Sequence, residues 1–568
     1  MTASTDKPLI VQPDCTVLLN AEHPAGAAAR ERLSLFAELV KRPGGIHTYR
    51  MTPLSLWNAA STGMTANQMM DWLTAFSRYE IPFEVESLIR KLVGRYGKLT
   101  LMVEEGILQL IGDPEIMDEL VTHSSIGEWL TERMDHGRWR IRDEGRGPLK
   151  QELTRFGFPV VDLAGYHTGE ALPVSLLKKT KKGRPFELRD YQKQAVQLFH
   201  REGTVQGGSG VIVLPCGAGK TVVGIAALAE LRSATLILTS NATSVKQWKQ
   251  ELLDKTTLES VDVGEYAGEL KQVCPVTIAT YQILTSRKRK GDPFPHMKLF
   301  SDRDWGLIIY DEVHLLPAPI FRKTADIQAT RRLGLTATLV REDGCAEDVF
   351  SLIGPKQYDL SWRSLEDRGY LAELTCREIR VPLPEAAARR YYASDLRPKG
   401  RIAAENPAKL LVVKKLLARH AGMPCLIIGQ YLQQLHRLAD ELEAPLLTGE
   451  LPQQERDKLY EAFKSGQLSV LIVSKVANFA VDLPDAAVAI QVSGSFGSRQ
   501  EEAQRIGRII RPKRGDNRAY FYTIVSDATV ELEYAMKRQL FMLEQGYHYE
   551  LETEVVFIEG GEQEAVSP

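Results

Sequence analysis

The 568-residue chain is too long for one hydrophobic core, because single cores stop growing beyond about 250–300 residues, so we expect about three domains. With 44% apolar and 25% charged residues and a formal net charge of −2, the composition excludes a disordered or fibrous protein, and any polyanion must be met by local basic clusters. No apolar run approaches the roughly 20 residues of a membrane span, and the N-terminus lacks the layout of a signal peptide, so we expect a cytoplasmic protein with no membrane partner.

The six cysteines are dispersed and form no C-x-x-C pair. Their spacing supports neither a zinc site nor a disulfide framework, and it offers no four-cysteine set for an iron–sulfur cluster. We therefore expect free thiols and no cysteine-bound metal.

Residues 1–175 are expected to form an accessory region that is helical at first and then a small α+β unit. Apolar residues recur at helical spacing over residues 52–77, where Thr65 and Gln68 fit a capping box that begins a second helix. Residues 98–112 consist of two apolar runs separated by turn residues, and this pattern predicts a hairpin.

Between residues 210 and 525, short apolar strands alternate with amphipathic helices, as is typical of parallel α/β layers. The strands are expected at 210–214, 234–239, 276–280, 306–311, 426–429, 470–474, 488–492 and 519–525. A charged stretch with less strand character, 377–410, separates the two sets. The fold class is therefore α/β, with one parallel-sheet domain at 176–375, a second at 376–555 and a disordered tail at 556–568.

The sequence LPCGAGKT, residues 214–221, predicts a phosphate-binding loop between a strand and a helix. Backbone N–H groups and the helix N-terminus would converge on phosphate oxygens there. Lys220 would reach the β- and γ-phosphates, and Thr221 would ligate Mg²⁺. Leu214 stands where the full motif has glycine, so the match is to the relaxed form. The loop residues expected to bind ATP are Gly217, Ala218, Gly219, Lys220 and Thr221.

An acidic pair ends the apolar strand expected at 306–311. Asp311 is placed to hold Mg²⁺, and Glu312 to orient and deprotonate the attacking water. An acidic pair at a strand end is usually only solvated. In the same alternating domain as a phosphate loop, it indicates the second half of a nucleotide-hydrolysing site.

A segment just before the first of these strands is a candidate for adenine recognition. Gln192 offers both a donor and an acceptor to an adenine edge, with Phe186 and Arg189 beside it. A glutamine on a surface helix is the alternative interpretation.

Three arginines in QRIGRIIR, Arg505, Arg508 and Arg511, fall near one face of a helix in the second α/β domain. Arginines delivered across a domain cleft stabilise the charge of a transferring phosphoryl group. Arg508 and Arg511 are therefore candidate catalytic residues, and a solvated charged helix is the alternative.

The order and spacing of these motifs resemble those of superfamily-two helicases. The resemblance sharpens to the XPB family of DNA repair helicases through DEVH, GLTATLVREDG and SGSFGSRQEEAQRIGRIIR. The segment before the XPB motor is similar to IHTYRMTPLSLWNAASTG, FSRYEIP and RYGKLTL, so the resemblance covers nearly the whole chain and points to a bacterial XPB-like protein.

That resemblance implies two tandem RecA-like motor domains, ATP and Mg²⁺ as cofactors, and ATP-driven 3′-to-5′ movement on DNA in repair. It implies DNA junctions between single strands and duplex as substrate, a nuclease or other repair protein as partner, and association with the nucleoid. It assigns coupling to Thr336 and Thr338, and contacts with the DNA backbone to residues 238–248 and 277–284. The phosphate-loop, acidic-pair and arginine roles given above match the family's assignments.

A charged triplet, Arg341, Glu342 and Asp343, follows the Thr-Ala-Thr sequence. Arg341 would grip a phosphate, whereas two carboxylates beside a polyanion repel it and would steer one strand away from the other. The family resemblance associates this triplet with strand separation. A solvated turn whose charges pair with one another is the alternative.

Four functions stay open from the sequence. The first is a DNA helicase, and the second is a double-strand translocase that moves duplex without separating it. A DNA-binding scaffold with ATP as a clamp is suggested by the stretch 477–480, where Asn478, Phe479 and Ala480 depart from the family pattern while Asp482 is retained. An RNA helicase is the fourth, because loops that grip the backbone do not by themselves distinguish the 2′-hydroxyl.

Overall fold

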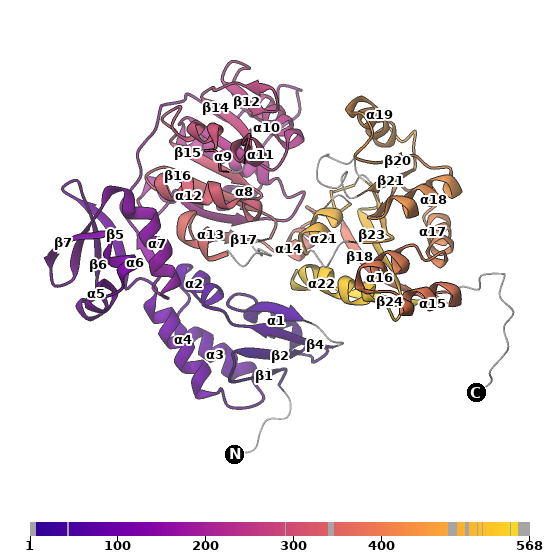
Figure 1. Cartoon of the computed structure of the whole chain (residues 1–568), viewed down its shortest axis with the longest axis horizontal. Coiled ribbons are helices and arrows are strands. Elements are labelled where there is room, and N and C mark those ends of the chain that lie inside the picture. Colours follow the sequence, from indigo (N-terminus) through magenta and orange to yellow (C-terminus); the bar gives the residue numbers. More distant parts are fainter. Residues whose placement is uncertain are drawn as a thin grey trace. The chain divides into compact units, whose positions relative to one another are not determined.

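The computed structural model describes residues 7–41, 45–289, 291–338, 346–474, 486–494, 499–507, 509–513, 515–545 and 547–554. The chain divides into two compact units (Figure 1). The first unit comprises Met1–Pro215 and Gly219–Leu360, and the second comprises Ser361–Pro568 together with Cys216–Ala218. Within the described ranges no helix is long and apolar enough to cross a membrane. Within those ranges no cysteine takes part in a disulfide.

The first unit begins with an antiparallel sheet that the sequence analysis did not anticipate. Its strands are β1 (Leu9–Val11), β2 (Thr16–Asn20), β3 (Glu38–Lys41) and β4 (Ile46–Arg50), in the order β1-β2-β4-β3. The accompanying helices are α1 (Gly26–Leu33), α2 (Pro53–Ser61), α3 (Ala66–Phe76) and α4 (Phe83–Arg95). Helices α2 and α3 lie within the predicted helical segment, and the capping box of Thr65 with Gln68 at the start of α3 is confirmed.

The predicted hairpin is present in a second accessory sheet. Strands β5 (Leu99–Glu104) and β6 (Ile107–Gly112) pair antiparallel, with Glu105 and Gly106 both at positive φ in the turn. The other strands are β7 (Leu130–Asp135), β8 (Arg138–Ile141) and β9 (Val160–Asp162), in the order β7-β8-β6-β5-β9. The helices are α5 (Pro114–Val121), α6 (Ser124–Gly127) and α7 (Arg146–Arg155). Leucines from β5, β6 and α7 share one apolar core, so this region is a small α+β unit, as predicted.

An eight-stranded sheet forms the rest of the first unit. Its order is β13-β12-β14-β11-β15-β16-β10-β17, and its pairs are parallel except for β12 with β13. The strands are β10 (Ser209–Val213), β11 (Thr235–Thr239), β12 (Val263–Ala267), β13 (Leu270–Lys271), β14 (Val276–Thr280), β15 (Leu307–Asp311), β16 (Arg331–Thr336) and β17 (Lys356–Asp359). The helices are α8 (Asp190–His200), α9 (Lys220–Leu231), α10 (Ala242–Lys255), α11 (Tyr281–Leu284), α12 (Ala318–Asp326) and α13 (Ala346–Leu352). The four strands predicted for this sheet are confirmed. Every residue of β11 and β14 is buried, as expected for parallel strands that are covered on both faces.

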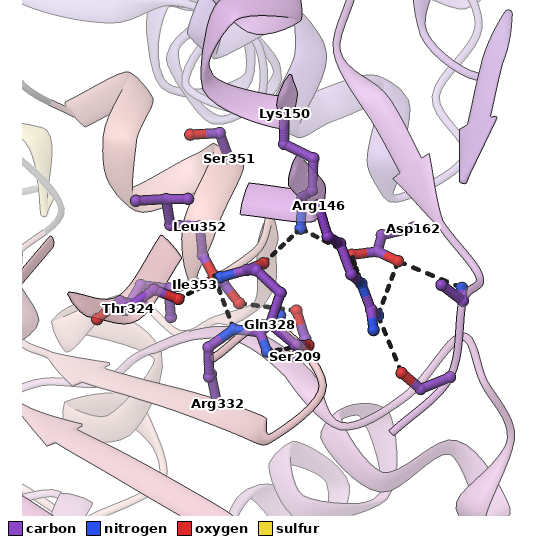
Figure 2. Close-up of polar contacts among 12 residues, drawn as sticks. Arg146, Lys150, Asp162, Ser209, Thr324, Gln328, Arg332, Ser351, Leu352 and Ile353 are labelled. Atoms are coloured by element: carbon purple, nitrogen blue, oxygen red, sulfur yellow. Dashed lines mark hydrogen bonds and ion pairs between the residues drawn. The ribbon is translucent and has the colours of Figure 1, made fainter. Parts of the chain in front are cut away.

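Polar side chains connect the second accessory sheet to the eight-stranded domain (Figure 2). Asp162 at the end of β9 accepts two hydrogen bonds from Arg146 on α7, at 2.9 and 3.1 Å. Lys150, also on α7, donates to Asp162 at 2.9 Å and to the Oε1 atom of Gln328 at 2.9 Å. The backbone carbonyl of Gln328 accepts from Arg332 on β16 at 2.7 Å. The accessory sheet and the start of β16 are thus joined by a buried charged network.

The second unit contains a seven-stranded parallel sheet in the order β20-β21-β19-β22-β23-β18-β24. Its strands are β18 (Glu373–Val381), β19 (Cys425–Gly429), β20 (Leu446–Leu447), β21 (Val470–Ser474), β22 (Val488–Gln491), β23 (Arg518–Ser526) and β24 (Tyr549–Thr553). The helices are α14 (Trp362–Asp367), α15 (Glu385–Ala393), α16 (Leu396–Ala404), α17 (Ala408–Arg419), α18 (Leu432–Leu442), α19 (Gln453–Lys464), α21 (Arg499–Ile506) and α22 (Val530–Glu544). All four strands predicted for this domain are confirmed.

Strand β18 corrects the expectation that the stretch from residue 377 lacks strand character. Its charges hid the strand in the sequence, but the structure pairs them. Arg377 contacts Glu550 and Glu552 on the neighbouring β24 at 2.8 and 2.9 Å, and Arg380 contacts Glu378. The predicted tail at 556–568 lies outside the described residues.

Candidate nucleotide-binding site

The predicted phosphate loop runs between the end of β10 and the start of α9. Gly217 and Gly219 have φ of +81° and +82°, the left-handed region that side-chain-bearing residues avoid. Gly219 precedes the first helical residue, Lys220. A Cβ at Gly219 would also stand 2.6 Å from the Nε2 atom of Gln192, so a side chain there would displace the Gln192 amide. The loop therefore leads into the N-terminus of α9, and a helix N-terminus is suited to phosphate oxygens.

The acidic pair lies at the carboxyl end of β15, in the same parallel sheet. Asp311 is the last residue of the strand, and Glu312 follows at φ +50° and ψ +54°. This left-handed conformation is costly for a residue with a side chain and typical of functional positions. The Oε1 atom of Glu312 lies 3.3 Å from the Nζ atom of Lys220, with both side chains largely shielded from solvent. The fold thus brings together the two halves of the predicted site.

Two carboxylates lie side by side at this site, next to the Lys220 ammonium. Burial, and then the neighbouring Glu312 carboxylate, raise the pKa of Asp311 to about 6, against the opposing effects of a Trp248 hydrogen bond and the Lys220 ammonium. No cluster of three or more His, Cys, Asp or Glu side chains suited to a metal occurs in the described residues. Mg²⁺ typically binds one or two protein oxygens and completes its shell with water and phosphate. The carboxylate of Asp311 and the hydroxyl of Thr221 fit that ion.

The DEVH histidine, to which the sequence analysis gave no role, connects the acidic pair to the predicted coupling residues. The Nδ1 atom of His314 lies 2.8 Å from Thr336 Oγ1 and 3.6 Å from Glu312 Oε2. Thr336 in turn bonds the backbone of Thr338, which donates its N–H to Thr336 Oγ1 at 3.1 Å. Both threonines are buried, and Thr336 is separated from Glu312 by one side chain, that of His314. A change at the end of β16 would therefore reach the acidic pair through His314.

Of the three adenine candidates, Gln192 lies beside the loop. It is buried on α8, and its Oε1 atom accepts the Arg189 backbone N–H at 3.0 Å. The Arg189 guanidinium donates to the Tyr191 hydroxyl at 3.1 Å. Phe186 packs against the Lys255 ammonium, 5.7 Å from its ring centre. Gln192 is thus the member of this set whose amide lies next to the phosphate loop.

The remaining candidates lie in the second unit or outside the described residues. Arg511 belongs to the second unit. Arg505 is buried on α21 and donates to Gln491 of β22 at 2.8 Å, an internal bond of that unit. The structure does not describe Arg341, Glu342, Asp343, Asp482 and Arg508.

Two tandem parallel α/β sheets, the first with a phosphate loop after one strand and an acidic pair after another, define a superfamily-two motor with two RecA-like domains. Family models match along the chain. The model described as "ERCC3/RAD25/XPB C-terminal helicase" covers residues 365–567, "Type III restriction enzyme, res subunit" covers 185–341, and "Helicase conserved C-terminal domain" covers 9–135.

Curated relatives extend the likeness over the whole chain. "DNA 3'-5' helicase XPB" of Kineococcus radiotolerans is 50% identical over 563 residues, 99% of each chain. The protein of the same name from Mycobacterium tuberculosis is 48% identical over 96% of this chain and 97% of its own length. "General transcription and DNA repair factor IIH helicase/translocase subunit XPB" of Enterocytozoon bieneusi is 33% identical over 96% of this chain and 92% of its own. The chain belongs to the XPB family of helicases.

Proposed function

We propose that the chain is an ATP-dependent 3′-to-5′ DNA helicase that couples ATP hydrolysis to the opening of duplex DNA in repair. Membership of a family whose bacterial relatives are named DNA 3'-5' helicases supports the polarity and the substrate. The observation that carries the hydrolytic part is the 3.3 Å contact between Lys220 and Glu312 beside Asp311. It joins a phosphate-binding cation to a candidate base.

The geometry suggests how these residues would act in sequence. In the structure the Lys220 ammonium is paired with Glu312. Phosphate oxygens of ATP compete for that ammonium, so nucleotide binding would release the Glu312 carboxylate to accept a proton from the attacking water. Thr221 and Asp311 would hold Mg²⁺, which neutralises charge on the phosphates when bound. Gln192 would contact the adenine from beside the loop.

Other roles follow from the family and from charge chemistry. Arg508 and Arg511 would supply positive charge to the transferring phosphoryl group, and Thr336 and Thr338 would couple hydrolysis to movement, with Asp482 contributing from the second domain. The triplet Arg341, Glu342 and Asp343 would act at the strand junction. A nuclease or another repair protein would be the partner, and work on DNA would place the protein at the nucleoid.

A strand-release assay on tailed duplexes tests this function. With ATP and Mg²⁺, a 3′-tailed DNA duplex should be opened, whereas a 5′-tailed DNA duplex and the matching RNA duplexes should stay intact. Release from 5′-tailed DNA alone would contradict the polarity, and preferential opening of RNA would contradict the substrate.

A duplex translocase is the second candidate, because the relative from Enterocytozoon bieneusi carries "helicase/translocase" in its name. Replacing Arg341, Glu342 and Asp343 with alanine separates the two activities. A helicase would lose unwinding while keeping DNA-stimulated ATP hydrolysis. A translocase would hydrolyse ATP and displace a third strand from a triplex, with no strand release before or after the substitution.

A further inference from the structure

One tryptophan contacts the candidate metal carboxylate directly. Trp248 lies on α10 and is 1% exposed. Its indole Nε1 atom donates a hydrogen bond to Asp311 Oδ2 at 2.8 Å. The indole N–H can only donate a hydrogen bond, and an ionised carboxylate can only accept one, so this contact favours the ionised form of Asp311. Trp248 therefore acts on the orientation and the charge of Asp311.

The fold makes room for this ring at one glycine. A Cβ at Gly224 on α9 would stand 2.6 Å from the Cη2 atom of Trp248 and 3.1 Å from Leu335 on β16. The indole is thus packed against the helix that begins with Lys220 and Thr221. Burial and close packing against α9, together with the bond to Asp311, hold the direction of its N–H. Such a preformed contact positions a functional side chain without reorganisation when the ligand arrives.

A second bond holds the backbone of the same residue. The hydroxyl of Tyr281, at the start of α11, donates to the Asp311 carbonyl at 2.8 Å. Trp248 and Tyr281 belong to the segments 238–248 and 277–284, which the family resemblance associates with the DNA backbone. Each segment is therefore one hydrogen bond away from the candidate metal ligand.

We propose that Trp248 is a positioning residue that occupies Oδ2 of Asp311 and so presents Oδ1 to nucleotide-bound Mg²⁺. The same bond transmits DNA engagement at the start of α10 to the ATP site. The inference rests on the proposed function, because it takes Asp311 as a metal ligand. Helix α10 begins after its N-cap Asn241, and its N-terminal end lies in the segment that the family resemblance associates with DNA, with the indole in its second turn. A displacement of that end would move the Nε1 atom relative to the carboxylate.

The test substitutes Trp248→Phe, which keeps an aromatic side chain on α10 and removes the N–H. The matched control is Trp305→Phe. Trp305 is 2% exposed in the same domain, and its Nε1 atom donates to a backbone carbonyl, that of Leu299, at 2.8 Å. The control therefore makes the same tryptophan-to-phenylalanine change and also removes an indole N–H hydrogen bond, but at a site away from Asp311.

Binding of a fluorescent ADP analogue is measured with Mg²⁺ and with EDTA. Trp248→Phe should weaken binding with Mg²⁺ about 10-fold, as expected for losing a hydrogen bond to a charged group, and leave binding in EDTA unchanged. Trp305→Phe should lower the melting temperature without changing the ratio of the two affinities. An unchanged ratio in Trp248→Phe would overturn the proposal and reduce the residue to packing. Absence of nucleotide binding by the wild-type protein would instead contradict the proposed function.

The transmission step has its own measurement. Trp248→Phe should lower the stimulation of ATP turnover by saturating DNA while DNA affinity stays at the wild-type value. Stimulation equal to that of Trp305→Phe would overturn this step. If Trp248→Phe does not fold, replacing Trp248 with benzothienylalanine keeps the two-ring shape and exchanges the N–H for sulfur, and the same affinity ratio decides.

Discussion

Two largely buried aspartates of the first unit show opposite electrostatics. At the candidate site, burial and the adjacent Glu312 hold the pKa of Asp311 above its usual value. In the network that joins the accessory sheet to β16, burial alone would raise the pKa of Asp162, but Lys150 and Arg146 outweigh it, and the pKa falls well below its usual range. An aspartate therefore lies beside another carboxylate at the candidate site, whereas in the network with β16 an aspartate lies between two cations.

The difference separates a binding site from a structural contact. Asp311 and Glu312 are adjacent carboxylates beside the Lys220 ammonium, and two carboxylates held this close attract a divalent cation. Asp162 serves Arg146 and Lys150, both largely buried, and Arg332 lies beyond Gln328 in the same network. Removing the Asp311 carboxylate should relieve its repulsion with Glu312. Removing the Asp162 carboxylate should leave two buried cations to repel each other.

The largest expected effect is on chemistry at the acidic pair. Glu312→Gln should lower ATP turnover about 10³-fold, within the range of about 10²–10⁴ for loss of a general base, while nucleotide binding persists. Steady-state hydrolysis and equilibrium binding on one preparation measure both. Turnover near the wild-type rate would remove Glu312 from the role of base.

Asp162→Asn should give the largest loss of stability. The substitution leaves Arg146 and Lys150 buried without their carboxylate, and breaking such a pair costs about 3–5 kcal/mol. Denaturant unfolding of the first unit measures it. The control is Glu170→Gln, which breaks the partly exposed pair with Arg303 and should cost about 1 kcal/mol or less. Equal losses in the two variants would contradict the contrast.

Asp311→Asn should stabilise the protein by about 2 kcal/mol at pH 7, while Mg²⁺-dependent hydrolysis is lost. An acid whose pKa is raised on folding binds more protons in the folded state between the two pKa values. Stability therefore falls as pH rises from 3.8 to about 6, and the cost persists above that range. Melting temperatures of wild type and variant across this window should diverge as pH rises. If Asp311→Asn had a lower melting temperature than wild type at pH 7, the ionised Asp311 carboxylate would not be destabilising the folded state.

Lys150→Met should have the smallest effect, within about 1 kcal/mol at pH 7, because Asp162 keeps both hydrogen bonds from Arg146. Burial, opposed by Asp162 but reinforced by two arginines, lowers the pKa of Lys150 from 10.5 to about 8. Between these values the unfolded state binds more protons, so wild-type stability should gain from this residue as pH rises. The variant should lack that gain. If the free energies of unfolding of wild type and Lys150→Met changed with pH in parallel, the lowered pKa of Lys150 would be contradicted.

The sequence predicted the elements of the fold that are recognisable from one contiguous segment. Strands such as β11 and β14 are buried on both faces and consist of apolar residues and threonines, which favour strands, so they could be recognised. Strands β18 and β24 carry charges whose partners lie on each other, which no single segment reveals. The sheet β1 to β4 was missed for a related reason, since its short strands pair across intervening loops and a helix.

The candidate site divides in the same way. Lys220 and Glu312 were found because each belongs to a motif of contiguous residues. Trp248 lies in the segment 238–248, to which the family resemblance assigned contacts with the DNA backbone, and its proposed role depends on a contact with Asp311 that no spacing predicts. The Asp162 network was not anticipated, because its members come from the accessory sheet and from β16.

Strand release from a 3′-tailed DNA duplex, measured for wild type, Glu312→Gln and Asp162→Asn below the melting temperature of each, tests the account most directly. Wild type and Asp162→Asn should open the duplex when ATP and Mg²⁺ are present. Glu312→Gln should bind ATP and DNA yet release no strand. Release by Glu312→Gln at the wild-type rate, or no release by the folded Asp162→Asn protein, would contradict the assignment of one aspartate region to catalysis and the other to structure.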